Sequence, residues 1–147
     1  EARIKRSLVY DISTSVVDET DVGFVGITAA AQAENINRIL DVVIAEIKKL
    51  AAEPVSSLEL ERAKRQMIVA LTKKAEDNED SIEVSAEQLL NFGRLRSTEE
   101  QISRINAVST DDVLAAAAAI FATTPSYLVQ GRIADCYSYE QIKAKLR

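Results

Sequence analysis

The sequence predicts an α+β fold in which helices pack on one face of an antiparallel sheet. Two strand-like runs, at 8–17 and 22–31, open the chain and are joined by a short polar turn. A block of amphipathic helices follows, and a further strand-like run lies late in the chain, at 126–131. Strands and helices that are grouped in this way, rather than alternating, are typical of an α+β architecture.

The first run alternates between apolar and polar side chains. Its apolar face holds Leu8, Tyr10, Ile12 and Val16, and its polar face holds Asp11, Ser13 and Ser15. This period of two indicates a strand with one buried face. The second run is apolar on both faces, and its two glycines, Gly23 and Gly26, allow another segment to approach closely. Because only the polar residues 18–21 separate the two runs, we expect an antiparallel hairpin.

Six helices are expected. Apolar residues from Ile36 to Leu50 recur at intervals of three and four, which is typical of an amphipathic helix. The other helices are expected to run from Ser56 to the acidic stretch 76–80, over 81–92, from 97 to 105, from 109 through the alanines 115–119, and over 138–146. Capping-box patterns mark three of the helix starts, at Ser56, 97–100 and Ser109, and Gly93 is expected to end the helix over 81–92.

Composition excludes several classes of function. A chain of 147 residues predicts one α+β domain or domain fragment over 1–147. The net charge of -5 argues against nucleic acid as a partner, since phosphate backbones bind clustered Lys and Arg. No apolar run reaches the roughly 20 residues of a membrane helix, so no membrane partner is expected. Cys136 is the single cysteine, which excludes an internal disulfide and favours a reducing compartment.

Histidine is absent from the chain. This excludes Ser-His-Asp and Cys-His nucleophilic systems and every zinc site that relies on imidazole, so we predict no catalytic residue and no metal ligand in this segment. Asp111 and Asp112 are expected to serve a helix N-terminus rather than chemistry. The acidic run 76–83 has two interpretations that stay open: a solvated helix boundary, or a negative surface that accepts basic peptides.

Several segments, in their order along the chain, resemble the pitrilysin-type zinc peptidases, or inverzincins. The segment "RIKRSLVY" at 3–10 resembles the stretch R-E-K-R-G-L-x-Y of that family, which a hairpin and a long helix follow. The resemblance continues through "PVSSLELERAKRQMIVAL", "SAEQLLNFGR" and "RINAVSTDDVLAAAAAIF". It covers nearly the whole chain and is strongest to the processing-peptidase branch.

The resemblance implies that this chain is the second half of a non-zinc domain. In that family, related α+β domains face each other across a cavity, and one of them carries the zinc motif H-x-x-E-H. A chain without histidine cannot contain that motif, so zinc and the general base would come from a partner domain or subunit. The segment itself is then expected to bind no cofactor and to be inactive when isolated. A single parent chain, a homodimer and a heterodimer all remain open, and the compartment expected is bacterial cytoplasm or mitochondrial matrix.

The resemblance also implies a substrate-binding role for Arg3 and Tyr10. In the family, an Arg and a Tyr at this spacing reach from the non-zinc domain into the cleft and contact the substrate backbone near the scissile bond. A guanidinium or a phenol can donate a hydrogen bond to a carbonyl oxygen as negative charge builds on it. The residues alone indicate a structural role, with Tyr10 as a core or edge tyrosine and Arg3 as a solvated cation at a helix end. The resemblance puts the substrate-binding role beside this interpretation, and both stay open.

One departure from the family pattern bears on this role. Ser7 stands where the family has Gly, and a position that requires positive φ would be strained by Ser and would displace Tyr10. Two functions therefore stay open: the substrate-side wall of an active zinc endopeptidase, and a non-catalytic scaffold or assembly subunit of the same family. An unrelated α+β binding module is the third interpretation.

Overall fold

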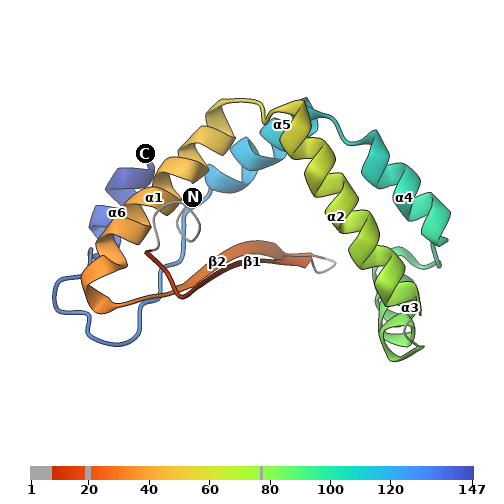
Figure 1. Cartoon of the computed structure of the whole chain (residues 1–147), viewed down its shortest axis with the longest axis horizontal. Coiled ribbons are helices and arrows are strands. Elements are labelled where there is room, and N and C mark those ends of the chain that lie inside the picture. Colours follow the sequence, from red (N-terminus) through yellow and green to blue (C-terminus); the bar gives the residue numbers. More distant parts are fainter. Residues whose placement is uncertain (1–7, 19–20, 77) are drawn as a thin grey trace. The chain divides into compact units, whose positions relative to one another are not determined.

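The computed structural model of the protein describes residues 8–18, 21–76 and 78–147. In these residues a two-stranded antiparallel sheet, β1 (Asp11–Asp18) and β2 (Gly23–Ala30), is followed by a 3₁₀ turn, η1 (Ala33–Asn35), and by helices (Figure 1). The helices are α1 (Ile36–Ala52), α2 (Ser57–Glu76), α3 (Asn78–Phe92), α4 (Thr98–Ala107), α5 (Thr110–Phe121) and α6 (Tyr139–Leu146). The predicted α+β class is confirmed.

The chain divides into two compact units. The first consists of Glu1–Asp18, Val22–Glu53 and Leu114–Arg147, and the second consists of Glu19–Asp21 and Pro54–Val113. The first unit therefore contains the hairpin, α1, most of α5 and α6, whereas the second contains α2, α3 and α4. The expectation of one domain over 1–147 stays a prediction.

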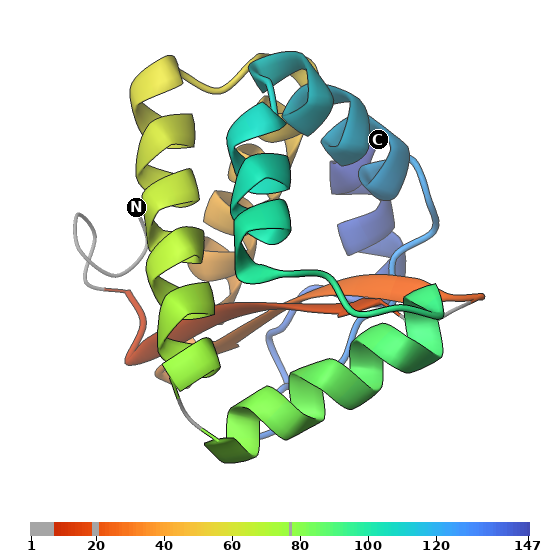
Figure 2. The ribbon, with the colours of Figure 1, turned by 90° about the vertical axis from the view of Figure 1, so that its right-hand side faces the viewer.

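In the first unit, α1 packs against the end of the hairpin at which β1 begins and β2 ends. The strands pair from Asp11 opposite Ala30 to Asp18 opposite Gly23. Leu8, Ile39 and Val42 form a buried cluster, and Ile12 of β1 and Ala31, which follows β2, pack against it. Both views show α1 and α6 on the same side of the hairpin (Figure 1, Figure 2). The amphipathic stripe predicted for residues 36–50 is thus the packed side of α1, which confirms helices on one face of the sheet within this unit.

In the second unit, α2 contacts both α3 and α4. A lysine secures the contact with α4: the Nζ atom of Lys64 donates to the carbonyl oxygen of Asn106 at 3.0 Å. Only 11% of the Lys64 side chain is exposed. Its aliphatic stem therefore packs between the helices while its charged end satisfies a carbonyl at the C-terminal end of α4.

Most of the predicted helix boundaries are confirmed by their hydrogen bonds. The Oγ atom of Ser56 accepts from the backbone of Glu59, and that of Ser109 accepts from Asp112, with each carboxylate reaching back to its serine. Gly93 follows α3 with φ at 67°, a conformation that glycine adopts without strain. At Ser97 only half of the predicted box forms, because the Glu100 carboxylate is bound elsewhere.

The predicted strand at 126–131 is wrong. These residues have no regular secondary structure, and within the described part of the chain the sheet contains β1 and β2 alone. The pattern that indicated a strand is nevertheless real, since side-chain burial alternates along the segment. A strand also needs a neighbouring strand for its backbone hydrogen bonds, and the described residues do not provide one for this segment.

Candidate functional site

Tyr10 lies immediately before β1. Its backbone is fixed by a hydrogen bond to β2 and by the burial of the nearby Leu8. Its N–H donates to the carbonyl oxygen of Ala30 at 2.8 Å. Two residues earlier, Leu8 is only 6% exposed in the cluster with Ile39 and Val42. The side chain of Tyr10 itself is 66% exposed. The hairpin thus presents the phenol to solvent from an anchored backbone, so Tyr10 is not a core tyrosine, and both the edge position and the substrate-facing role remain compatible with its placement.

The other residues of the candidate site lie outside the described residues. Arg3 and Ser7 both fall before residue 8, so the pairing of Arg3 with Tyr10 and the effect of Ser7 stay predictions. The acidic run 76–83 is described only in part, and most of its side chains fall outside the description as well. The two interpretations of that run remain open.

A polar network that sequence reasoning missed joins α1, the loop before α6, and α6. The Asp41 carboxylate accepts from the Tyr137 hydroxyl at 3.1 Å and from the Lys145 Nζ atom at 2.9 Å. One turn earlier, the Asn37 side chain donates to the carbonyl oxygen of Asp135 at 2.7 Å and accepts from the N–H of Tyr137 at 2.9 Å. The paired residues are about 100 positions apart, so no local pattern could have indicated them. The network fastens the C-terminal helix to α1.

The network shifts the pKa values of its two charged members. The hydrogen bond from Lys145 holds the pKa of Asp41 below its ordinary value of 3.8, and the bond from Tyr137 acts in the same direction. The hydrogen bond to Asp41 raises the pKa of Lys145 above 10.5. The carboxylate therefore stabilises the fold above the pKa it has in the unfolded chain, and this contribution is lost as pH falls through its lower folded value. The lysine contribution is full below 10.5 and is lost as pH rises through the higher folded value.

We therefore expect Asp41→Asn to lower the melting temperature at pH 7, and this difference from wild type to close as pH falls below 4. The matched control is Asp135→Asn, since the network uses only the backbone carbonyl of Asp135. Thermal melts at a series of pH values measure both effects. A difference that is unchanged at pH 2 would show that the Asp41 charge does not contribute.

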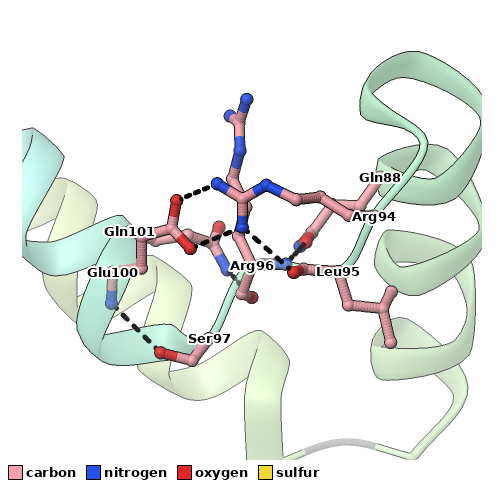
Figure 3. A network of polar contacts seen from close by, with 7 residues as sticks. All are labelled: Gln88, Arg94, Leu95, Arg96, Ser97, Glu100 and Gln101. Atoms are coloured by element: carbon pink, nitrogen blue, oxygen red, sulfur yellow. Dashed lines mark hydrogen bonds and ion pairs between the residues drawn. The ribbon is translucent and has the colours of Figure 1, made fainter.

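A second network fixes the connection between α3 and α4 in the second unit (Figure 3). Arg94 binds Glu100 through two hydrogen bonds, Nη1 to Oε2 at 2.8 Å and Nη2 to Oε1 at 2.5 Å. The Gln88 side chain accepts from the N–H of Arg96, and the Gln101 side chain donates to its carbonyl. This paired geometry takes the Glu100 carboxylate away from Ser97 and leaves the capping box half formed.

Arg94 and Glu100, the ion pair of this second network, stabilise each other's ionised forms. The hydrogen bond from Arg94 lowers the pKa of Glu100, and the reciprocal bond raises the pKa of Arg94. The guanidinium of Arg96 lies 3.5 Å from the centre of the Phe92 ring, a cation–π geometry. Every one of these contacts serves the turn between two helices, so the arrangement is structural and offers no reactive group.

The described residues do not form a metal site. No group of three or more His, Cys, Asp or Glu side chains in the described part of the chain is placed to hold a metal ion. The chain has no histidine at all. Zinc sites are built from imidazole, thiolate and carboxylate ligands, usually three or four together. The described residues therefore do not fit a zinc ion, and Cys136, the one cysteine of the sequence, donates weakly to the carbonyl of Arg132.

Comparison with known proteins places these features in a family. Residues 1–67 match the family described as the peptidase M16 inactive domain. Those residues are thus similar to that inactive-domain family. The match covers the hairpin, α1 and the first half of α2. The resemblance to the non-zinc domain of the pitrilysin-type peptidases is thereby confirmed.

Two curated relatives and a solved structure are similar to this chain over most of its length. An uncharacterized zinc protease of Streptomyces coelicolor is 26% identical over 92% of this chain, and the alpha subunit of the mitochondrial-processing peptidase of Caenorhabditis elegans is 29% identical over 86%. A chain of the complex III dimer of Candida albicans, with Inz-5 bound, superposes at a TM-score of 0.80 over 98% of this chain, at 19% identity. The last likeness shows the fold alone.

The chain spans only part of the length of these proteins. It covers 29% of the Streptomyces protease, 25% of the Caenorhabditis subunit and 35% of the complex III chain. The relatives include a bacterial protein and a mitochondrial one. Where the structure describes helices, none is long and apolar enough to cross a lipid bilayer.

Proposed function

We propose that this chain forms the zinc-free wall of the peptide-binding chamber of an M16 endopeptidase. Zinc and the general base would come from another domain or subunit, since the residues here do not fit the metal. The observation that carries the proposal is the placement of Tyr10: it stands at the motif position that the family uses, and its phenol is 66% exposed on an anchored hairpin. The match to the M16 inactive domain and the relatives' names support the same reading.

In this proposal Tyr10 acts through its hydroxyl. A phenol donates one hydrogen bond and also accepts, so it can bind a backbone carbonyl of an extended peptide. That bond strengthens as negative charge develops on the oxygen during attack, and it favours the transition state over the bound substrate. Arg3, seven residues earlier in the sequence, would supply a second donor to the same stretch of substrate. Both residues are substrate-binding residues in this proposal, and the chemistry at the metal belongs to the partner.

The position of Tyr10 suits a group that must orient a substrate. Leu8 is locked in the core and the N–H of Tyr10 is bonded to β2, so the backbone cannot move freely with respect to α1. Tyr10 lies outside β1, but its backbone is bonded to β2, and a binding group that is anchored to a regular element is held more precisely than one on a free loop. The entropic cost of ordering the Tyr10 backbone is thus incurred when the protein folds, before the substrate binds.

The second candidate function is a non-catalytic scaffold or assembly subunit of the same family. It is favoured by Ser7, which replaces the family glycine next to the motif. The two candidates differ in whether an H-x-x-E-H motif exists in the parent protein or in a subunit that binds it. A parent assembly that contains the motif and cleaves peptides supports the enzyme, and an assembly without it supports the scaffold.

We expect added zinc to leave the melting temperature of the 147-residue chain unchanged. A ligand that binds only the folded state raises that temperature, because its stabilising free energy grows with the logarithm of one plus its concentration divided by its dissociation constant. The measurement is a thermal melt with and without a tenfold excess of zinc chloride, with EDTA as the reference. The variant Cys136→Ser removes the lone thiol as a source of weak binding. A clear upward shift in both proteins would contradict the assignment of zinc to the partner.

A further inference from the structure

One exposed face of α2 forms a shallow groove with a cationic lining. The groove has a volume of about 400 Å³, and every residue that lines it is exposed. We call this surface the α2 groove. Its lining comes from α2 alone and is Arg62, Arg65, Gln66, Val69, Ala70 and Lys73. These residues meet on one face because positions three, four, seven and eight apart lie on the same side of an α-helix.

The α2 groove lies opposite the side of α2 that packs on α4. Figure 2 shows α4 alongside α2, and the half-buried Lys64 and Ile68 mark the packed side, where Lys64 donates to Asn106 of α4. Successive residues of a helix are about 100° apart around its axis, so Val69 and Lys73 point about 140° and 180° away from Lys64. The contact between α2 and α4 therefore leaves the groove exposed.

The three cations of the groove lack a counter-ion. Among the residues that the structure describes, none forms an ion pair or a side-chain hydrogen bond with Arg62, Arg65 or Lys73. The helix holds five Lys and Arg residues and three Glu residues, whereas the whole chain has 18 Lys and Arg against 23 Asp and Glu. Between Arg65 and Lys73, the groove is apolar at Val69, which is 54% exposed, and at Ala70. An acidic protein thus presents one local surface that is both cationic and apolar.

We propose that the α2 groove binds an acidic amphipathic helix of a partner protein. Arg62 and Lys73 are eleven residues apart, which is three helical turns, or about 17 Å along the axis. A partner helix with Asp or Glu at positions i, i+3 and i+11 has the same spacing as the three cations, so each carboxylate meets one of them. Aliphatic side chains between these acids cover Val69 and Ala70. This inference goes beyond the proposed function, because it involves neither Tyr10 nor zinc.

Two other anionic partners fit the α2 groove less well. Proteins that bind single-stranded nucleic acid combine cations with aromatic side chains on which the bases stack, and the lining of the groove contains no aromatic residue. A helix that lies on an anionic membrane buries a broad apolar face. The apolar part of the groove is confined to Val69 and Ala70. Carboxylates that alternate with aliphatic side chains match both parts of this surface.

Charge reversal at two neighbouring lysines tests the proposal. Lys73→Glu changes a cation of the groove, and Lys74→Glu changes an exposed lysine that does not line it. Both lysines lie in the last turn of α2, so the two variants have the same net charge and lose the same favourable interaction with the helix dipole. The probe is a fluorescein-labelled synthetic helix of about 16 residues, which spans about 24 Å, with Glu at the stated spacing and Leu between. Its reference is the same peptide with Gln in place of Glu.

Binding of the peptides to the 147-residue chain is measured by fluorescence anisotropy at low salt. We expect Lys73→Glu to weaken binding of the acidic peptide about tenfold and Lys74→Glu to weaken it less than about twofold, because the coupling of close charges requires direct contact. The Gln peptide should bind at least about tenfold more weakly than the acidic one. Equal effects of the two variants, or equal binding of the two peptides, overturns the proposal. Tighter binding of phosphatidylserine vesicles or of polyuridine RNA, with the same loss on Lys73→Glu, identifies a different occupant and also overturns it.

A second pair of substitutions tests the apolar part of the α2 groove. Val69→Ala is expected to weaken binding of the acidic peptide about threefold, because it removes apolar surface that the partner would cover. Met67→Ala is the matched control, since Met67 is 59% exposed on the same helix and does not line the groove. The melting temperature should not fall in the Val69 variant, because Ala favours a helix more than Val does. Equal affinities of the two variants would mean that charge alone holds the peptide, and the amphipathic partner would then be wrong.

Discussion

Replacing Tyr10 with Phe in the assembled peptidase is expected to lower kcat about 100-fold and to leave KM nearly unchanged. The substitution removes one oxygen atom and keeps the ring. If the hydroxyl bonds the carbonyl oxygen mainly as negative charge develops there, its loss raises the transition state more than the bound substrate. Because Tyr10 is 66% exposed, the fold should not change. Steady-state kinetics on a peptide substrate measure both constants.

Tyr139→Phe is the matched control for this experiment. Its hydroxyl donates to the carbonyl oxygen of Pro125 at 3.1 Å, so the same atom is removed from a structural contact in the same unit. We expect kcat to be unaffected by this control. Unchanged kinetics in the Tyr10 variant would reduce Tyr10 to an edge tyrosine and leave the scaffold reading as the better one. A rise in KM with constant kcat would keep the contact with substrate but remove the role in the transition state.

Ile39→Ala is expected to destabilise the first unit by about 2–5 kcal/mol. Ile39 is 3% exposed, the least of the buried hydrophobic residues described, and it joins Leu8 and Val42 in the cluster between α1 and the hairpin. The variant loses the transfer free energy of the removed atoms and leaves a cavity. The same cluster anchors Leu8, so peptidase activity that depends on Tyr10 should fall together with stability. Urea denaturation of the purified protein measures the change in the free energy of unfolding.

The control for Ile39 is Leu58→Ala in α2. Leu58 is 80% exposed, so truncating it removes almost no buried surface, and surface changes of this kind usually stay within about 0.5 kcal/mol. Hydrogen exchange along α1 assigns the loss in the Ile39 variant to the first unit. A loss below about 1 kcal/mol for Ile39→Ala would mean that the cluster does not hold α1 on the hairpin.

The candidate site shows what a sequence motif can predict and what it cannot. The motif around residues 3–10 and the absence of histidine together predict the non-zinc domain of a zinc peptidase, and the match of residues 1–67 to the peptidase M16 inactive domain confirms that resemblance. The motif does not determine whether Tyr10 packs inward or stands in solvent, because Leu8, Tyr10 and Ile12 share one face of the strand. The packing of α1 decides this, because Ile39 and Val42 of α1 bury Leu8 while Tyr10 stays exposed.

Local signals determined the elements with good accuracy. The capping pair at Ser109 and the stop at Gly93 lie where the sequence predicts them, since each depends on residues no more than four positions apart. The capping box at Ser97 is the exception, since only half of it forms, and the structure shows the cause. Arg94 competes for Glu100 with two charge-assisted hydrogen bonds, which are stronger than the bond that the carboxylate could accept from the Ser97 N–H.

The sequence by itself thus determined the hairpin, the helices, most of their caps and the absence of histidine. Only the tertiary structure decided the exposure of Tyr10, the fastening of α6 through Asp41, and the unpaired condition of 126–130. The physical reason is the range of the interactions. Periodicity and capping arise from neighbours along the chain, whereas burial and strand pairing depend on groups up to about 100 residues away, whose side-chain types alone do not specify one another.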